Sequence, residues 1–380
     1  MPSPAGWRIA VQAALNPEEQ ARVCAAHCLE QLALSDLLPH TQVRFGTDAA
    51  GHFVQMHLSA EQTDGWAPDW DTLGLAARLH LKPHTDLDDL RREIVLAMLM
   101  APVALEFPSF DELESAIRIR IYVVQAARKT NLAFCTCEAD RPQAFWHYDE
   151  DRGFVIRPGV SLIEALTHAT QPEVSGGLYS FSCYRASEYV ILLGIAQEIA
   201  VSNPDLYAEL QQLWQAQPLK SAKFHDVFLR EQGSMDTPLP ARFFVPGDRT
   251  WFRNPDSASA DASGFEGSWV MYLGNGLFNN FWKHAQPYTL TDKCLEIYHW
   301  RNAVFLDAEG EPRIDEAKVA RLVDATRQDS MEMARIEALM QRYREARGIY
   351  TDAGGCMDTT REFARWVRPG TADLILPRCD

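Results

Sequence analysis

The spacing of hydrophobic residues predicts helices and strands in the first third of the chain. Apolar residues recur every three or four positions over 17–34, 90–100 and 111–129, which is typical of helices with one buried face. Apolar and polar residues alternate over 41–46 and 52–58, and the turn residues between these segments indicate a β-hairpin. The first 90 residues are therefore predicted to form a small α+β unit.

The pattern changes twice in the rest of the chain. Helical spacing over 186–200 predicts a long helix that begins close to Cys183. The periodicity is strand-like from 242 to about 306 and helical again, with many charges, over 314–347. The final residues are predicted to form a covering arm. These changes divide the chain into an N-terminal α+β extension, a core with a sheet, and a helical C-terminal cap with its tail, over residues 1–90, 91–308 and 309–380.

Length, composition and charge exclude several classes of protein. With 380 residues, of which 47% are hydrophobic, the chain is long enough for a sizeable core and unlike disordered or collagenous sequences. The formal net charge of −16 opposes binding to nucleic acid or to anionic membranes. No uncharged apolar run approaches the length of a membrane span, and charged residues interrupt the region where a signal peptide would lie. These features favour a cytoplasmic location, with non-classical export left open.

The eight cysteines are irregularly spaced, which does not fit a disulfide framework, so most are expected to be free thiols. Cys24, His27 and Cys28 share a predicted helix face, and Cys135 and Cys137 form a Cys-x-Cys pair. Neither group has a second pair of ligands at zinc-finger spacing, and buried cysteine is a common small hydrophobic residue. We therefore predict no metal site.

Cys183 has the sequence context of a nucleophile. It stands where a loop runs into a helix, and the unpaired N–H groups of a helix start favour a thiolate. The preceding Gly176-Gly177 allows the backbone to approach a substrate closely. The alternative is a buried structural cysteine at a helix start, and residues further along the chain distinguish the two.

Five collinear segments connect Cys183 with a known family. The segments are 100–103 with Ser109, Glu112 and Leu113; 120–127; 179–183; the Pro-Gly-Asp turn 246–248 with 252–255; and Gly267 with Leu273 and Gly274. They resemble the bacterial spore-coat type protein-glutamine γ-glutamyltransferases, which are similar to the papain-like, NlpC-related cysteine enzymes. The resemblance implies an α+β fold in which the helix that carries the nucleophile, Cys183, packs on a mostly antiparallel sheet.

The chain departs from the family at three of the four polar positions of its site. The acidic residue before the nucleophile is Ser182, the essential carboxylate after the glycine is Ser268, and the histidine of the following hairpin is Asn280. A serine hydroxyl cannot usefully take a thiol proton, because its pKa lies far above 7. The resemblance thus supports the scaffold more strongly than the catalytic machinery.

Glu266 and His284 are the candidate replacements for the missing acid and base. A three-residue hairpin loop at 274–276 would place Glu266 opposite His284 on one face of the sheet. Cys183, His284 and Glu266 would then form a thiol, base and orienter, with Asn280 on the same face. A two-residue loop at 275–276 would turn His284 to the other face. The alternative is that both side chains are solvated surface residues.

His225 and His299 are further candidate bases, although a core role is favoured for His299 because apolar residues surround it in the sequence. The same region is rich in aromatic residues, which either line a tunnel to the thiol or form a packed core, the second being favoured. These aromatic residues are Trp251, Phe252, Phe265, Trp269, Tyr272, Phe278, Phe281 and Trp282.

The resemblance implies acyl transfer through a Cys183 thioester, giving cross-linking or deamidation of protein glutamine. The expected partners are proteins or peptides that carry glutamine and, for cross-linking, lysine. The chief alternative is a catalytically degenerate scaffold with a binding or structural role, and the second is a cell-wall peptide amidase or peptidase acting as an exported toxin. No glycine-rich phosphate loop or Glu-x-x-His pattern is present, so no cofactor is expected.

Overall fold

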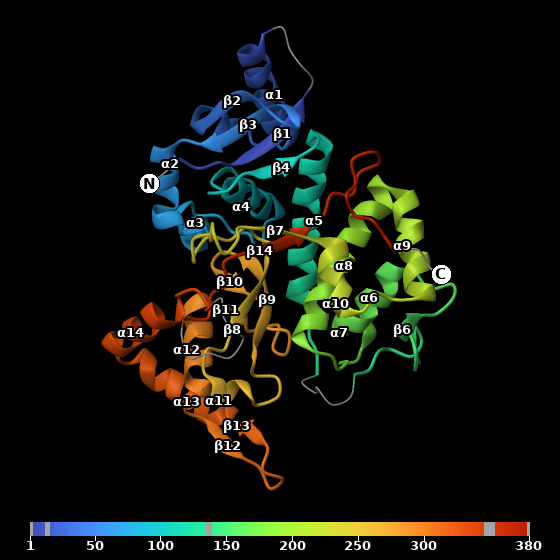
Figure 1. Cartoon of the computed structure of the whole chain (residues 1–380), viewed down its shortest axis with the longest axis vertical. Helices are drawn as coiled ribbons and strands as arrows, with labels where there is room; N and C mark the ends of the chain where they lie inside the picture. Colours follow the sequence, from blue (N-terminus) through green and yellow to red (C-terminus); the bar gives the residue numbers. More distant parts are fainter. Residues whose placement is uncertain (1–2, 12–15, 134–138, 346–353, 378–380) are drawn as a thin grey trace.

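A computed structural model describes residues 3–11, 16–133, 139–345 and 354–377. Two larger β-sheets organise this part of the chain, and helices pack around them (Figure 1). The α+β class predicted from the sequence is confirmed. No helix among the described residues is long and apolar enough to cross a membrane.

The first sheet has four strands and belongs mainly to the N-terminal region. Its order is β2-β3-β1-β4, in which β1 pairs antiparallel with β3 and parallel with β4. The predicted hairpin is confirmed, because β2 and β3 pair in antiparallel register up to Asp48 opposite Gly51. The fourth strand follows α4, beyond the predicted boundary at residue 90. The elements are β1 (Trp7–Val11), α1 (Pro17–Gln31), β2 (Thr41–Asp48), β3 (Gly51–Leu58), α2 (Ala60–Trp66), α3 (Leu75–Arg78), α4 (Leu87–Leu99) and β4 (Leu105–Phe107).

The second sheet has six strands, and every neighbouring pair in it is antiparallel. Its order is β11-β10-β9-β8-β14-β7, so the expected mostly antiparallel sheet is present. The predicted covering arm is wrong in part: β14, from the C-terminal tail, lies inside the sheet between β7 and β8 (Figure 1). The strands are β7 (Leu229–Gln232), β8 (Arg249–Arg253), β9 (Gly267–Gly274), β10 (Leu277–Phe278), β11 (Tyr288–Thr289) and β14 (Arg361–Ala364).

Helix α8 (Cys183–Ser202) lies between the six-stranded sheet and the surrounding helices, and it packs on β9. Its long neighbour α5 approaches it closely at Gly194, where an added Cβ would lie 2.6 Å from Val123 Cγ2. This contact fixes α8 against α5, so the first turn of α8 has a defined place beside the sheet. The other elements on this side are α5 (Phe110–Lys129), β5 (Trp146–Asp149), β6 (Gly153–Ile156), α6 (Leu162–Thr170), α7 (Pro172–Ser175), α9 (Pro204–Ala216) and α10 (Ser221–Phe228).

The region after the sheet hairpin differs from the predicted run of strands. Residues 290–300 form helix α12, because Thr289 and Asp292 make a reciprocal capping box that starts a helix. The charged helices predicted over 314–347 are present as α13 and α14. The elements are α11 (Ser257–Ala260), α12 (Leu290–Trp300), β12 (Val304–Leu306), β13 (Pro312–Ile314), α13 (Glu316–Arg327) and α14 (Ser330–Met340).

Candidate active site

Cys183 is the first residue of α8, as predicted. Ser182 is the N-cap of this helix, and its side-chain oxygen accepts a hydrogen bond from the backbone N–H of Arg185 at 3.3 Å. This cap satisfies one of the free N–H groups of the first turn and fixes the direction in which the chain enters the helix. The serine that replaces the family's acidic residue therefore has a structural role here.

The thiol of Cys183 lies between the first turn of α8 and strand β9. Burial raises its pKa above the ordinary thiol value. Four groups act in the opposite direction: the backbone N–H of Trp269, the Lys293 ammonium, the backbone N–H of Tyr184 and the Arg249 guanidinium. The surroundings thus favour a negative charge at this sulfur, but they do not fully offset the loss of solvation.

Arg249 belongs to an aromatic and cationic cluster behind the thiol. Its guanidinium carbon lies 4.0 Å from the centroid of the Trp269 ring and 4.7 Å from that of Tyr184. The guanidinium is completely buried, and its Nη1 lies 3.4 Å from Glu362 Oε2 on β14. Glu362 lies on β14, in the tail that was predicted to form a covering arm. This strand therefore supplies the counter-charge for the buried Arg249.

A cavity of about 250 Å³ lies beside the thiol and brings two of the altered family positions together. Ser268 on β9 and Asn280 after β10 both line it, facing Lys293 and Glu296 of α12 and Tyr288 of β11. Tyr288 and Lys293 also interact electrostatically with Cys183, so the sulfur lies next to the cavity wall. The remaining lining residues include Phe265, Trp282, Lys283 and Trp300.

Lys293 holds a fixed positive charge in this cavity. Burial lowers its pKa, but Glu296, whose Oε2 lies 2.7 Å from Lys293 Nζ, and Tyr288 more than offset this, and the net shift is upward. The Nζ atom also lies 4.3 Å from the centroid of the Tyr288 ring. Burial raises the pKa of Tyr288 to about 12. At neutral pH the ammonium and the neutral phenol are not proton acceptors, and the carboxylates that line the cavity are those of Glu296, which pairs with Lys293, and Glu316.

The predicted pairing of Glu266 with His284 does not occur. The hairpin begins with Leu277 opposite Gly274, as a two-residue loop requires, and a bulge then brings Phe278 opposite Tyr272. Strand β10 ends at Phe278, while β9 begins only at Gly267, so the ladder reaches neither side chain.

Asn279 and Asn280 explain why the return strand is short. Asn279 Oδ1 accepts the backbone N–H of Met271 at 2.6 Å and takes the place of a backbone partner in the ladder. Asn280 Oδ1 then accepts the N–H groups of Trp282 and Lys283 at 3.3 and 3.2 Å, which turns the chain away from the sheet. Asn280 is thus brought to the cavity, but through a turn and not through the strand register that the sequence predicted.

The other predicted site residues lie apart from the thiol. Glu266 is exposed in the loop before β9, and the Gly264 N–H lies 3.4 Å from its Oε1. His284 is half-buried in the loop between β10 and β11. His225 Nδ1 lies 2.9 Å from Glu362 Oε1. His299 is hydrogen-bonded to the Thr326 hydroxyl at 2.8 Å within the core, which agrees with the core role favoured for it from the sequence. None of the described imidazole or carboxylate groups hydrogen-bonds to the Cys183 sulfur.

The aromatic residues of this region serve both of the predicted purposes. Trp251 stacks on Trp269 with centroids 6.1 Å apart, and Phe252, Tyr272 and Phe278 are fully buried in the core. In contrast, Phe265, Trp282 and Trp300 line the cavity beside the thiol. The packed-core interpretation therefore holds for Phe252, Tyr272 and Phe278, and the lining interpretation for Phe265 and Trp282.

The structure brings together a group of possible metal ligands other than the two considered in the sequence. Cys24 and Cys28 lie with their sulfur atoms 4.0 Å apart on α1, and Cys135 and Cys137 lie outside the described residues. Within the described ranges, His225, Glu231 and Glu362 place ligand atoms within 4.8 Å of one another. Glu362 already pairs with both His225 and the buried Arg249, so an ion-pair network explains this group.

The site thus has a cysteine at the start of a helix that packs on an antiparallel sheet, beside a cavity lined by aromatic rings, in a fold of the α+β class. The family model for protein-glutamine gamma-glutamyltransferase matches residues 75–348, and the chain belongs to this family. The resemblance found in the sequence is thereby confirmed. A solved structure, the transglutaminase from Geobacillus stearothermophilus without its C-terminal extension, is 20% identical, with 57% of this chain and 98% of that chain covered and a TM-score of 0.39. Curated proteins yielded no match.

Sequence reasoning missed the charged residues that surround the thiol. Lys293, Tyr288 and Glu296 lie in a region whose periodicity was interpreted as strand. The Thr289-x-x-Asp292 capping signal could have identified the helix and placed Lys293 on its first turn. No sequence signal connects Arg249 with Glu362, because they are brought together only by the strand order of the sheet.

Proposed function

We propose that the protein transfers acyl groups from glutamine side chains through Cys183. The thiolate attacks the carboxamide carbon, the C–N bond breaks, and ammonia leaves with a proton to give a thioester. A lysine amine then displaces the thiol and forms an isopeptide bond, or water displaces it and leaves glutamate. The substrates are proteins or peptides that carry glutamine and, for cross-linking, lysine. Membership of the family supports this class of substrate.

The observation that carries the proposal is the convergence of N–H donors and cations on one sulfur. The backbone N–H groups of Trp269 and Tyr184 and the charges of Lys293 and Arg249 all favour the thiolate form of Cys183. The same donors can stabilise negative charge on the oxygen of a tetrahedral intermediate formed at this sulfur. A structural cysteine has no need of this environment.

The proton of the thiol leaves without a side-chain base. Because the pKa of Cys183 is raised by burial, only a small fraction is thiolate at neutral pH. Lys293 is charged and Tyr288 is neutral there, so neither accepts the proton. Glu296 is held by Lys293, and none of the described carboxylates hydrogen-bonds to the sulfur. Water or hydroxide therefore takes it, and the reaction is slow and follows the thiolate fraction. Transfer should rise about tenfold per pH unit from pH 7 to 9, without a plateau below the ordinary thiol pKa.

Ammonia release and amine incorporation test the proposal directly. The substrates are benzyloxycarbonyl-glutaminyl-glycine and a fluorescent primary amine, at pH 7 to 10. Cys183→Ala should remove all transfer. Cys24→Ala is the control and should retain transfer: the contact with Cys28 lowers the pKa of the Cys24 thiol to about 7, but Cys24 lies on α1, away from the cavity. Transfer that survives Cys183→Ala, or a rate independent of pH over this range, would overturn the assignment.

The degenerate scaffold is the second candidate, and the three replaced polar positions favour it. Ser182 acts as a helix cap, and neither Ser268 nor Asn280, which line the cavity, supplies a carboxylate or an imidazole. This candidate predicts that a glutamine peptide binds while no ammonia is released at any pH. It also predicts that iodoacetamide labels Cys183 no faster than the other thiols. No observation of the structure specifically favours the cell-wall peptidase interpretation.

A further inference from the structure

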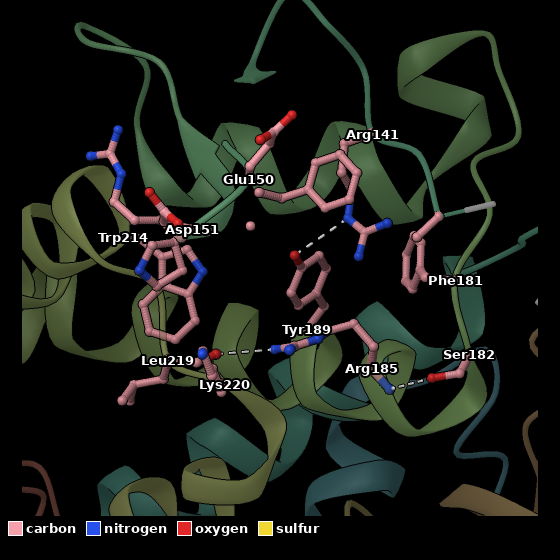
Figure 2. A pocket seen from close by; sticks show the side chains of 15 residues that line it. Arg141, Glu150, Asp151, Phe181, Ser182, Arg185, Tyr189, Trp214, Leu219 and Lys220 are labelled. Carbon is pink, nitrogen blue, oxygen red and sulfur yellow. Dashed lines mark hydrogen bonds between the residues drawn. The ribbon is translucent and has the colours of Figure 1, made fainter. Parts of the chain in front are cut away.

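A second and larger cavity lies on the other side of the segment that leads into α8. It measures about 490 Å³ and is bounded by Phe181 and Ser182, by α8, and by the loop between β5 and β6. Figure 2 shows Ser182 and Arg185 at its edge, joined by the helix-capping hydrogen bond. Because Ser182 is bonded directly to Cys183, the cavity reaches the residue that precedes the nucleophile.

Positive charge predominates in the lining of this cavity. Arg141, Arg152, Arg185 and Lys220 line it together with the carboxylates of Glu150 and Asp151. Arg152 and Arg185 already pair with Asp149 and Glu188, so Arg141 and Lys220 are the cations of the lining for which no carboxylate partner lies among the described residues. A concave cationic site on an acidic protein attracts anions selectively.

Arg141 is the strongest indication of an anionic ligand. Its side chain is 6% exposed, and its guanidinium carbon lies 3.9 Å from the ring centroid of Phe181 and 4.9 Å from that of Tyr189. Figure 2 shows the guanidinium between these two side chains. Its Nη1 donates to the backbone oxygen of Asp140 at 2.6 Å, and its Nε to the Tyr189 hydroxyl at 3.3 Å.

No described carboxylate lies within ion-pair distance of Arg141. The carboxylate nearest in sequence, that of Asp140, instead accepts a hydrogen bond from the Ser180 N–H. A buried guanidinium without a counter-charge is costly, and aromatic rings and carbonyl groups compensate for only part of its lost solvation. A carboxylate that enters the cavity would complete the compensation. The planar fork of arginine fits a carboxylate in two parallel hydrogen bonds.

We propose that this cavity binds the carboxylate of an aspartate or glutamate that lies close to the reactive glutamine in a peptide substrate. The inference rests on the proposed function, because that function places the glutamine at Cys183. An extended peptide advances about 3.3 Å per residue, so a residue a few positions away reaches across Ser182 into the cavity. The site thus selects glutamines in an acidic sequence context.

Peptide binding without turnover tests the inference. The protein is the full chain with Cys183→Ser, and the probe is a fluorescent glutamine peptide with glutamates on both sides, compared with the same peptide carrying glutamines there. At low ionic strength the acidic peptide should bind about tenfold more tightly by anisotropy. The double variant Arg152→Gln/Lys220→Gln should lower the ratio of the two affinities at least about fivefold. The matched control Asp151→Asn, which removes a negative charge from the same lining, should raise this ratio about twofold. Arg141→Gln should abolish it, with thermal unfolding as the check on its fold.

Three outcomes would overturn the inference. The first is equal binding of the two peptides, and the second is a preference that the Arg152, Lys220 and Asp151 variants leave unchanged. The third is displacement of the acidic peptide by free glutarate at an equal concentration, which would assign the cavity to a small dicarboxylate. The Cys183→Ser variant binds peptide without reacting, so its peptide preference is measured independently of acyl transfer. Absence of ammonia release by the wild type would therefore not change the binding result, and equal binding of the two peptides would not change the result for acyl transfer.

Discussion

The two walls of the site around the Cys183 thiol differ in how closely they follow the pattern of the family. The helix wall, at the start of α8 and outside the lining of the cavity, keeps the cysteine, with N–H donors from Tyr184 and from Trp269 on β9. The sheet wall, formed by β9 and the segment after β10, presents Ser268 and Asn280 where the family has a carboxylate and a histidine. A charged cluster from α12 faces them.

The difference shows that a scaffold and its acid–base groups are under separate physical constraints. Helix α8 needs a cap at its start, which Ser182 supplies, and a close approach to α5, which Gly194 allows in the middle of the helix. The strands of the sheet wall are supported by buried polar groups, among them Asp248 before β8 and Glu93 at the tip of the β9–β10 hairpin. Variants of these supporting residues, and of Lys293 where the walls meet, separate the two contributions.

The largest effect is expected for the turn that leads into β8. Asp248 Oδ1 lies 2.7 Å from Arg120 Nη1, both side chains are almost fully buried, and Asp248 Oδ2 accepts the Val245 N–H. Asp248→Ala leaves the arginine uncompensated and should lower the free energy of unfolding by about 3–5 kcal/mol. Urea unfolding measures this loss. Glu332→Ala, which breaks an exposed pair with Arg335, should leave the midpoint unchanged, and equal effects of the two changes would refute the argument.

A pH-dependent effect follows from Glu93, which supports the tip of the β9–β10 hairpin. Its Oε1 accepts the Asn275 N–H at 2.8 Å and the Tyr272 hydroxyl at 3.1 Å, yet burial raises its pKa to about 7. A raised pKa means that the folded state prefers the protonated carboxyl. Its contribution is complete below about pH 4.5 and is lost as the pH rises through 7.

Glu93→Gln should remove this dependence. Relative to the variant, the wild type should lose about 3 kcal/mol of unfolding free energy between pH 4.5 and 8. Chemical unfolding of both proteins across this range measures the difference, with Glu173→Gln on the surface as control. A constant difference between wild type and variant would show that Glu93 is charged in the folded state throughout.

On the helix wall, Gly194→Ala should destabilise the contact between α8 and α5. The new Cβ would lie 2.6 Å from Val123 Cγ2 and 3.3 Å from the Ile119 backbone oxygen, so we expect a loss of about 1–3 kcal/mol in unfolding free energy. Gly65→Ala in α2 is the matched control, because its Cβ meets no atom within 4 Å and helix propensity should stabilise the chain by up to about 1 kcal/mol. The same sign for both changes would contradict the close approach.

The smallest effect is expected where the walls meet. Lys293→Met keeps the volume of the side chain but removes a cation that lowers the pKa of Cys183. The thiol pKa should rise further, and iodoacetamide labelling of Cys183 at pH 8 should slow several-fold. Lys283→Met, on the exposed rim of the cavity, should leave the labelling rate as it is. If both variants label like the wild type, Lys293 does not act on the thiol.

The sequence by itself determined the features that depend on near neighbours in the chain. Helical spacing and a serine cap are local, so the start of the helix at Cys183 and the β2–β3 hairpin could be predicted. The collinear segments were also sufficient to identify the family.

The tertiary structure decided which groups meet at the thiol. Asn279 and Asn280 end β10 after two residues through side-chain hydrogen bonds, which separated Glu266 from His284. The antiparallel order of the second sheet brought the tail strand beside β8 and placed Glu362 against Arg249. Pairings of this kind depend on long-range strand order and on the desolvation of charges in the folded state, and neither quantity is encoded in the spacing of residues along the chain.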